Sequence, residues 1–320
     1  MSLIGQSVTI VGAGVAGLAA ARALALRGAS VTVLEQADAI REVGAGLQIS
    51  PNGAAVLRAL GLQGQLDAAS LRGQAVQLID GPTGEPVARL DLARLRPGQG
   101  YHFLHRSDLI DLLLRAATDA GVTVRLLSRI ALVDLSGARP AVQLDTGERL
   151  ETPLLIGADG LHSQVRAALN GPGQPFFTRQ VAWRAVIPCE SGATPVVEVH
   201  MGPRRHLVTY PLRGGTLRNI VAVEERAKWA EESWNLRDDP LDLRLAFEGF
   251  SPRVRGWLDR VEDPWLWGLF RHPVAATWVR PMGQGGVAIL GDAAHPTLPF
   301  LAQGASMGLE DAWVLADTLA

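Results

Sequence analysis

A glycine-rich segment near the start of the chain, residues 12–17 with the sequence GAGVAG, constrains the fold more than any other feature. It follows a β-branched run, residues 7–11, that predicts a buried strand, and a helix-forming stretch comes after it. A second apolar run, residues 30–34, ends at Glu35. A strand–helix–strand unit of this kind predicts a parallel sheet with helices packed on it.

The spacing within this unit predicts a site for a dinucleotide. Gly12 allows a tight turn, Gly14 lets a pyrophosphate approach the backbone, and Gly17 lets the helix pack closely on the strand. The helix N-terminus offers amide N–H groups to the anion, and a carboxylate 18 residues after the last glycine can bind the ribose hydroxyls. The motif alone does not separate NAD from FAD. The residues predicted to contact the dinucleotide are Gly12, Gly14, Val15, Ala16, Gly17, Glu35 and Gln36.

Two further motifs place an aspartate directly after an apolar strand. Gly157-Ala158-Asp159-Gly160 follows the run 154–156, and Gly291-Asp292 follows the run 287–290. An aspartate at the carboxyl end of a parallel strand can meet a ligand at the edge of the sheet. Either aspartate can instead cap the N-terminus of a helix, which is a common structural role.

Composition bounds the remaining possibilities. The chain has 320 residues and is 48% hydrophobic, which is enough for two packed cores. Its net charge of -2 does not favour binding to nucleic acid or to an anionic membrane, and it has no run of about 18 apolar residues that predicts a membrane span. Cys189 is the only cysteine, so an intrachain disulfide is excluded and a cytoplasmic location is expected.

The pattern of residues changes after Asn170. Alternating strands are predicted from there to about Arg280, among them residues 196–200 and 206–211. Seven of the eight tryptophans lie between Trp183 and Trp278, which predicts a second hydrophobic core and leaves a ligand pocket as the alternative.

The three motifs together resemble those of the class A flavoprotein aromatic hydroxylases. The segments VGAGVAG, GADGLHSQVR and LGDAAHPTLPFLAQGASMGLEDA occur in the order of that family, and the resemblance covers residues 8–319. Members similar to this chain include the salicylate hydroxylases, 3-hydroxybenzoate 6-hydroxylases and 6-hydroxynicotinate 3-monooxygenases. The resemblance implies an α/β fold with a Rossmann-like FAD-binding domain of the para-hydroxybenzoate hydroxylase type and an antiparallel β-sheet substrate domain. The expected FAD-binding domain comprises residues 1–74, 101–172 and 281–320, and the substrate domain comprises residues 75–100 and 173–280.

The resemblance also implies roles for residues around FAD. Arg41 and Arg106 are expected near the ribitol and pyrophosphate, although Arg41 fits an exposed loop charge equally well. Asp292 is expected to accept a hydrogen bond from a ribitol hydroxyl. Asp159 is expected to serve the FAD domain and the route of the nicotinamide cofactor.

The segment before the last predicted helix, residues 299–305 with the sequence PFLAQGA, is expected beside the flavin ring. Backbone N–H groups of Gly304 and Ala305 can point at the edge of the ring where reduced flavin carries negative charge. An ordinary entry of a loop into a helix is the alternative.

The predicted strand 206–211 carries the candidate catalytic residues. His206, Val208 and Tyr210 share one face because side chains alternate along a strand. The resemblance favours His206 as the base that deprotonates a phenol, with Tyr210 beside it, over a purely structural histidine. Gln48 and Pro299 are the other predicted substrate-binding residues. Arg184 can pair with a substrate carboxylate or form a structural salt bridge.

The expected function is therefore that of an FAD-dependent monooxygenase that consumes NADH or NADPH and O₂. It would hydroxylate a small aromatic acid of the hydroxybenzoate or hydroxynicotinate type through a flavin C4a-hydroperoxide. No metal is expected, because His295 has no second ligand at a suitable spacing. The family leaves a homodimer open. Three alternatives remain: a flavin enzyme acting on a non-aromatic substrate, an NAD-dependent dehydrogenase, and an FAD-binding protein without turnover.

Overall fold

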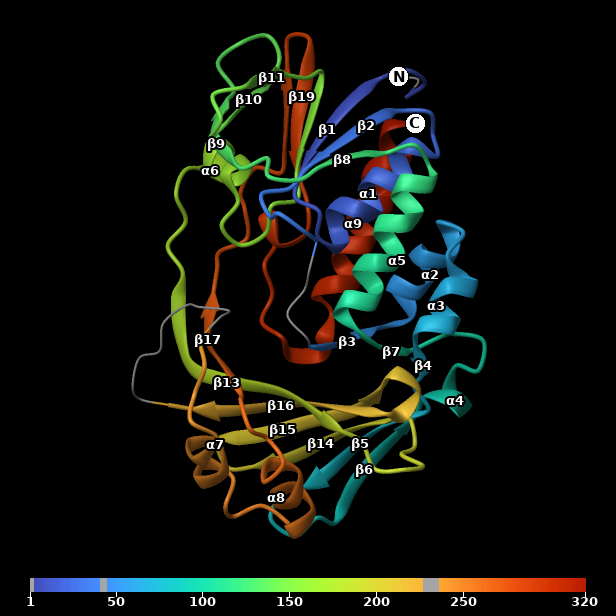
Figure 1. Ribbon diagram of the computed structural model, residues 1–320, viewed down its shortest axis with the longest axis vertical. Coiled ribbons are helices and arrows are strands. Elements are labelled where there is room, and N and C mark those ends of the chain that lie inside the picture. Colours follow the sequence, from blue (N-terminus) through green and yellow to red (C-terminus); the bar gives the residue numbers. More distant parts are fainter. Residues whose placement is uncertain (1–2, 41–44, 227–235) are drawn as a thin grey trace.

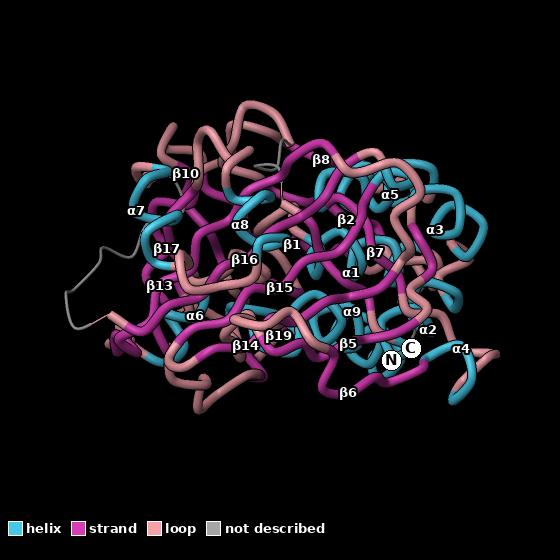
Figure 2. Tube along the Cα trace, turned by 90° about the horizontal axis from the view of Figure 1, so that it is seen from below, coloured by secondary structure: helices cyan, strands magenta, loops and turns pink. Residues whose placement is uncertain are grey.

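The computed structural model describes residues 3–40, 45–226 and 236–320. Two lobes, each built around one large β-sheet, are stacked along the long axis of the molecule (Figure 1). The upper lobe contains both ends of the chain. The view from below, Figure 2, shows the strands of the lower lobe crossing beneath the helices of the upper one. Any site shared by the two sheets must therefore lie between the lobes.

The upper sheet has six strands in the order β18-β19-β12-β1-β2-β8, and all neighbours are parallel except β18 and β19. Its strands are β1 (Ser7–Val11), β2 (Ser30–Leu34), β8 (Thr123–Arg125), β12 (Leu154–Gly157), β18 (Val279–Met282) and β19 (Gly285–Ile289). The central strands are short and mostly apolar, as strands covered on both faces tend to be.

Helices cover one face of this sheet, with α1, α5 and α9 side by side (Figure 1). The three-stranded sheet β11-β10-β9 covers the other face through a second apolar cluster. The helices of this lobe are α1 (Val15–Ala25), α2 (Pro51–Ala59), α3 (Gln63–Ala69), α5 (Arg106–Asp119), α6 (Gln164–Asn170) and α9 (Gly304–Leu319). The small sheet comprises β9 (Ile130–Asp134), β10 (Ala141–Leu144) and β11 (Arg149–Glu151).

The lower sheet has seven strands in the order β17-β13-β16-β15-β14-β5-β6. All its neighbours are antiparallel except β14 and β5, which run parallel. The strands are β5 (Ala75–Asp80), β6 (Pro86–Asp91), β13 (Phe176–Pro188), β14 (Val196–Gly202), β15 (Arg205–Leu212), β16 (Leu217–Glu225) and β17 (Trp265–Arg271). The helices α7 (Pro240–Ala246) and α8 (Pro252–Leu258) pack on the face turned away from the upper lobe.

Short elements connect the lobes. A three-stranded sheet, β3-β7-β4, lies between them (Figure 1). Its strands are β3 (Gly46–Ile49), β4 (Leu71–Arg72) and β7 (His102–His105). The remaining elements are α4 (Leu92–Leu95) and three short 3₁₀ turns, η1 (Arg213–Gly215), η2 (Gly291–Ala293) and η3 (Phe300–Ala302).

The structure confirms the α/β fold class and the second hydrophobic core. Only Trp183 and Trp257 among the described tryptophans belong to that core, whereas Trp265 and Trp267 lie under arginine side chains and Trp278 is partly exposed. Stacking on cations thus accounts for some of the tryptophans that the sequence assigns to packing.

The strands of the two large sheets fall into the residue ranges expected for the two domains, apart from β18, which spans the boundary at residue 281. The division into domains stays a prediction. The N-cap residue of α5 is His105, and its Nδ1 accepts the Ser107 N–H, because the helix begins at Arg106.

Candidate functional site

Three neighbouring parallel strands of the upper sheet end at the same edge. Val11 of β1 lies opposite Gly157 of β12, and Gly157 lies opposite Ile289 of β19. The loops that follow carry the three motifs found in the sequence. Parallel strands that end together place their loops around one crevice, which is where open α/β sheets bind ligands.

The three glycines of the first loop differ in the space around them. Gly12 has a φ of 101°, and a Cβ there would overlap the carbonyl group of Ala158. A Cβ on Gly17 would overlap the carbonyl oxygen of Gly12. A Cβ on Gly14 would have no protein atom within 4 Å. The first and third glycines therefore allow the turn to close, whereas Gly14 faces open space that a ligand can fill.

Helix α1 begins at Val15 beside this open space. Its N-cap residue is Gly14, and among the described residues no side chain caps the helix. The first N–H groups of a helix have no acceptor within the helix, so those at Val15 and Ala16 are available to an anion. A pyrophosphate fits both the space and the donors.

Glu35 ends β2 beside the same loop. Its Oε2 accepts the Ala13 N–H at 2.9 Å, and its Oε1 accepts the Ala37 N–H at 3.0 Å. Gln36 next to it is exposed. Each carboxylate oxygen can accept more than one hydrogen bond, so Glu35 can hold the loop and still accept a ribose hydroxyl.

Asp159 supports the N-terminus of helix α6, whose N-cap residue is Ser163. Its Oδ1 accepts the Ser163 hydroxyl at 2.5 Å, and its Oδ2 accepts the Gln164 N–H at 2.8 Å. The structural role is thus close to the one that the sequence leaves open, although Ser163 rather than Asp159 is the N-cap residue. Its predicted link to the nicotinamide cofactor remains a prediction.

Asp292 and Arg106 come together at this edge, although the sequence separates them widely. Asp292 lies in η2 with an exposed side chain, and burial of the surrounding surface still raises the pKa of its carboxyl. The nearby Arg106 guanidinium, at the start of α5, opposes that rise in pKa. A carboxylate that is accessible and yet poorly hydrated lies in a groove, where it can accept a hydrogen bond from a ligand.

The segment before α9 has an unusual backbone. Leu301 and Ala302 have φ values of 63° and 51°, a region that non-glycine residues rarely adopt. Helix α9 then begins at Gly304 after Gln303, and its N-terminus has no side-chain cap among the described residues. The N–H groups of Gly304 and Ala305 are therefore free of helical acceptors. Strain of this kind gathers at ligand-binding segments.

The upper face of the lower sheet carries His206. Its imidazole lies 5.9 Å from the Phe300 ring, centroid to centroid, so the sheet touches the segment that precedes α9. Burial lowers the pKa of His206, which keeps the ring neutral at pH 7 and able to accept a proton. A pocket of about 420 Å³ lies beside it. Its lining comprises Gln180, Val199, Met201, Gly202, Arg204, Arg205, His206, Val223 and Glu225.

Tyr210 lies further along the same strand and is 3% exposed. Burial raises its pKa, and a hydrogen bond links it to Gln48 of β3. The Tyr101 hydroxyl donates to Gln48 Oε1 at 2.7 Å, and burial raises the pKa of Tyr101 to about 12. Gln48 thus joins both tyrosines of the chain. The sequence pattern does not predict a site role for Tyr101. The signal that could have drawn attention to it is that the chain has only two tyrosines.

Two side chains of the lower sheet hold the backbone of Gly46 from both sides. Arg184 donates to the Gly46 carbonyl oxygen at 3.1 Å and lies over the Trp267 ring. The Gly46 N–H donates to Asn219 Oδ1 at 2.8 Å. Arg184 therefore joins the lobes in the structure. Of the other predicted residues, Pro299 is exposed ahead of η3, and Arg41 lies outside the described residues.

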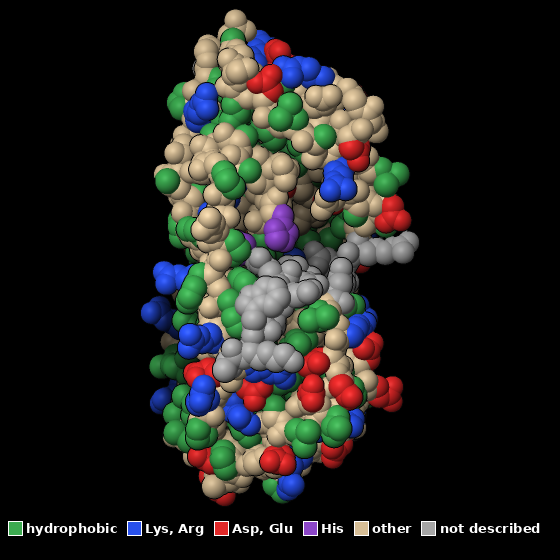
Figure 3. Space-filling view, turned by 90° about the vertical axis from the view of Figure 1, so that its left-hand side faces the viewer, with side chains coloured by type: hydrophobic (Ala, Val, Ile, Leu, Met, Phe, Trp, Pro, Cys, Tyr) green, Lys and Arg blue, Asp and Glu red, His purple; other side chains and the backbone are tan. Residues whose placement is uncertain are grey.

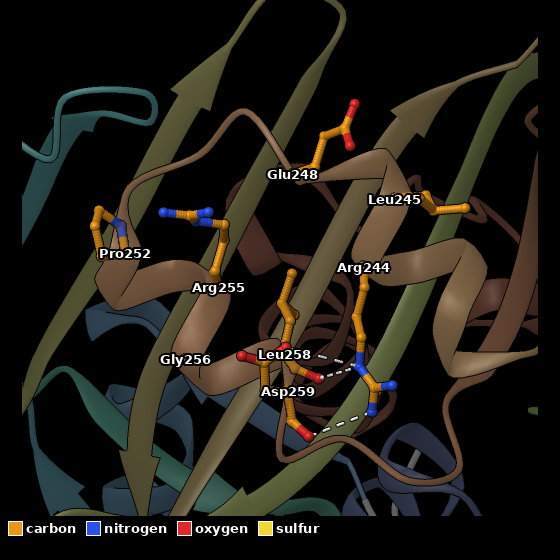
Figure 4. A pocket seen from close by; sticks show the side chains of 8 residues that line it. All are labelled: Arg244, Leu245, Glu248, Pro252, Arg255, Gly256, Leu258 and Asp259. Atoms are coloured by element: carbon orange, nitrogen blue, oxygen red, sulfur yellow. Dashed lines mark hydrogen bonds and ion pairs between the residues drawn. The ribbon is translucent and has the colours of Figure 1, made fainter.

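The surface between the lobes is hollowed, with histidine side chains beside the hollow (Figure 3). A second pocket, also of about 420 Å³, lies on α7 and α8 on the far side of the lower sheet (Figure 4). Arg244 in it donates to the carbonyl oxygens of Leu258 and Val261, so its guanidinium is engaged in helix packing.

Among the described residues, no three His, Cys, Asp or Glu side chains form a group that could hold a metal ion.

Comparison with known proteins decides the family. Residues 6–320 match the model of the family described as FAD binding domain. The chain belongs to this family. It is 32% identical to 3-amino-4-hydroxybenzoate 2-monooxygenase PtmB3 of Streptomyces platensis, over 98% of this chain and 79% of the relative. It is 35% identical to 3-hydroxybenzoate 6-hydroxylase of Polaromonas naphthalenivorans (strain CJ2), over 98% of this chain and 78% of the relative.

A solved structure shares the fold. Klebsiella pneumoniae HpxO, complexed with FAD and uric acid, superposes with a TM-score of 0.85 at 25% sequence identity, covering 98% of this chain and 79% of that one. The prediction of an FAD-dependent monooxygenase is confirmed at the level of the family, and the alternative of an NAD-dependent dehydrogenase is excluded. None of the helices within the described ranges is long and apolar enough to cross a membrane.

Proposed function

We propose that this flavoprotein hydroxylates a small aromatic acid that already carries a hydroxyl group, with NADH or NADPH as reductant and O₂ as oxidant. The observation that carries the proposal is the position of His206. It lines a pocket large enough for a single substituted ring and touches the segment before α9. The two relatives act, by their names, on hydroxylated benzoates.

FAD fits the edge of the upper sheet. Its pyrophosphate would occupy the space at Gly14 and the N-terminus of α1, and Glu35 would accept a ribose hydroxyl. Asp292 would accept a ribitol hydroxyl near Arg106. The flavin ring would lie at the uncapped N-terminus of α9, whose N–H groups stabilise negative charge on it. Bound FAD supplies the transfer of electrons from the nicotinamide to O₂.

The remaining steps belong to the side chains between the lobes. Neutral His206 would take the phenolic proton from the substrate at a ring nitrogen and so raise the electron density of the aromatic ring. Tyr210 keeps its proton because of its raised pKa, and it would donate a hydrogen bond to a substrate oxygen. These two residues are four positions apart on β15, which is about 13 Å along a strand and spans one substituted ring.

The overall reaction balances with one oxygen atom going to the substrate and the other leaving as water. NAD(P)H and a proton supply the two electrons and the hydrogens that this water requires. The two lobes would orient the substrate and exclude water. Exclusion of water matters because no oxygen atom reaches the substrate if the oxidant reacts with solvent first. Asp159 is proposed to act indirectly, by ordering α6 beside the route of the nicotinamide.

The test is a screen of hydroxylated benzoates and hydroxynicotinates. The purified chain loaded with FAD is mixed with each compound, and NADH oxidation, O₂ uptake and product mass are measured. A substrate should stimulate NADH oxidation, and its product should be heavier by about 16 mass units, the mass of one oxygen atom. Bound flavin without any stimulated oxidation would favour an FAD-binding protein without turnover. Non-aromatic compounds are screened alongside, and stimulated oxidation with these alone would favour an epoxidase.

A homodimer and a cytoplasmic location also stay part of the proposal. The single cysteine supports the location, and measurement of the molar mass in solution tests the assembly.

A further inference from the structure

One polar cluster near the FAD edge is not explained by the proposed contacts. The Asp311 carboxylate, on α9, accepts the Gly291 N–H through Oδ2 at 2.8 Å. The same oxygen lies 2.5 Å from His295 Nε2. The backbone N–H of His295 donates to the Gly291 carbonyl oxygen at 2.9 Å. One carboxylate therefore fixes both ends of the turn that contains Asp292.

This turn is tightly placed. Gly291 has a φ of 59°, and a Cβ on it would lie 3.0 Å from the Ala16 Cβ in the first turn of α1. The His295 side chain is 9% exposed and its ring lies 5.0 Å from the Trp278 ring. Asp292 is the residue of the turn whose side chain is exposed. The buried bonds thus hold the backbone while the carboxylate of Asp292 faces the groove.

Charge in the cluster is balanced by few groups. Asp311 and Asp292 are the acidic groups that act on His295, and both raise its pKa, Asp311 more strongly. Arg106, His295 and His272 are the basic groups that act on Asp292. His295 therefore lies between a carboxylate that it binds and one that faces the groove.

We propose that Asp311 and His295 are positioning residues for FAD: they set the turn that presents Asp292 to the ribitol. Helix α9 then controls two parts of the cofactor at once, since its N-terminus meets the flavin ring and its second turn fixes Asp292. The inference rests on the proposed contact between Asp292 and FAD.

The test measures the FAD dissociation constant, by recovery of flavin fluorescence on release, for the purified full chain and four variants. Asp311→Ala should weaken FAD binding about 10-fold or more, because the Gly291 N–H and His295 lose their acceptor. Asp311→Asn should weaken it less, because an amide oxygen can still accept one hydrogen bond. Asp317→Asn is the matched control on the same helix, since Asp317 is exposed and pairs only with Arg27 among the described side chains.

The pH profile separates positioning from general stability. Wild-type affinity should fall as pH rises through the pKa of His295, because the charged pair with Asp311 is lost, and His295→Gln should remove that dependence. Wild-type affinity in Asp311→Ala would overturn the proposal. If that variant does not fold, wild-type affinity and pH profile in both Asp311→Asn and His295→Gln would overturn it.

A parallel measurement on Asp292→Ala separates the ribitol contact from the positioning of Asp292 by its neighbours. Unchanged FAD affinity in Asp292→Ala would remove the proposed ribitol contact itself. Weakened FAD binding in Asp292→Ala together with wild-type binding in the Asp311 variants would overturn only the positioning role of Asp311 and His295.

Discussion

The edge of the upper sheet and the upper face of the lower sheet build their sites in different ways. At the edge, the site is formed mainly by backbone: strand ends, three glycines and two uncapped helix N-termini. On the lower face, it is formed by side chains such as His206 and Tyr210, aligned by the alternation of one strand. The edge suits a cofactor common to many proteins, whereas the face can change its substrate through single substitutions.

Substitutions at the glycines of the edge should have the largest effects. Gly12→Ala should destabilise the protein by about 3 kcal/mol or more, because φ is 101° and a Cβ would overlap Ala158. Gly14→Ala should change the unfolding free energy of the FAD-free chain by less than about 0.5 kcal/mol, yet weaken FAD binding. Chemical denaturation and flavin titration check both. If both variants destabilise the FAD-free chain to the same extent, the glycines of the edge serve packing alone.

On the lower face, His206→Ala should lower product formation about 100-fold or more while FAD affinity stays the same, because a general base is lost. The pH dependence in the wild type has a defined sign. The pKa of His206 is lowered, so activity should fall on acidification with a midpoint below the usual value of about 6.5. Full activity in the variant, with product quantified by mass, would remove His206 from the reaction.

A smaller effect is expected for Asp292→Ala at the edge. The variant should weaken FAD binding about 10-fold, the cost of one hydrogen bond to a charged group. The unfolding free energy of the FAD-free chain should not fall, since the wild-type carboxyl is accessible and has a raised pKa. Flavin titration and denaturation of the FAD-free chain check the two halves of this prediction.

The smallest effect is expected for Tyr101→Phe. The variant loses the hydroxyl that donates to Gln48, which should weaken substrate binding about three- to tenfold and leave FAD affinity unchanged. Titration of the flavin spectrum with substrate measures this. A change in FAD affinity instead would place Tyr101 with the edge rather than with the face.

The sequence predicts the edge well because its logic is local. An apolar strand followed by a glycine or an aspartate indicates a loop at the end of a strand, and three such loops indicate one crevice. The neighbours of those loops are not local. Asp311 meets Gly291 only because α9 folds back on the turn, and Gly46 meets Asn219 only because the lobes meet there. No periodicity specifies such partners, and the same reason hides Tyr101 beside Gln48.

The parallel pairing of β5 with β14 has a consequence for how the chain can be made. Residues 75–91 contain a hairpin whose partner strand begins only at Val196, and just part of the upper lobe, the helices α5 and α6 and the strands β8 to β12, lies between them in the sequence. A nascent hairpin of this kind exposes an unpaired edge until its partner is synthesised, and such long-range pairing slows folding. Expression of either lobe as a single continuous fragment should therefore give aggregated protein, and the ribosome must release the chain as far as Arg271, the end of β17, before the lower sheet can be complete.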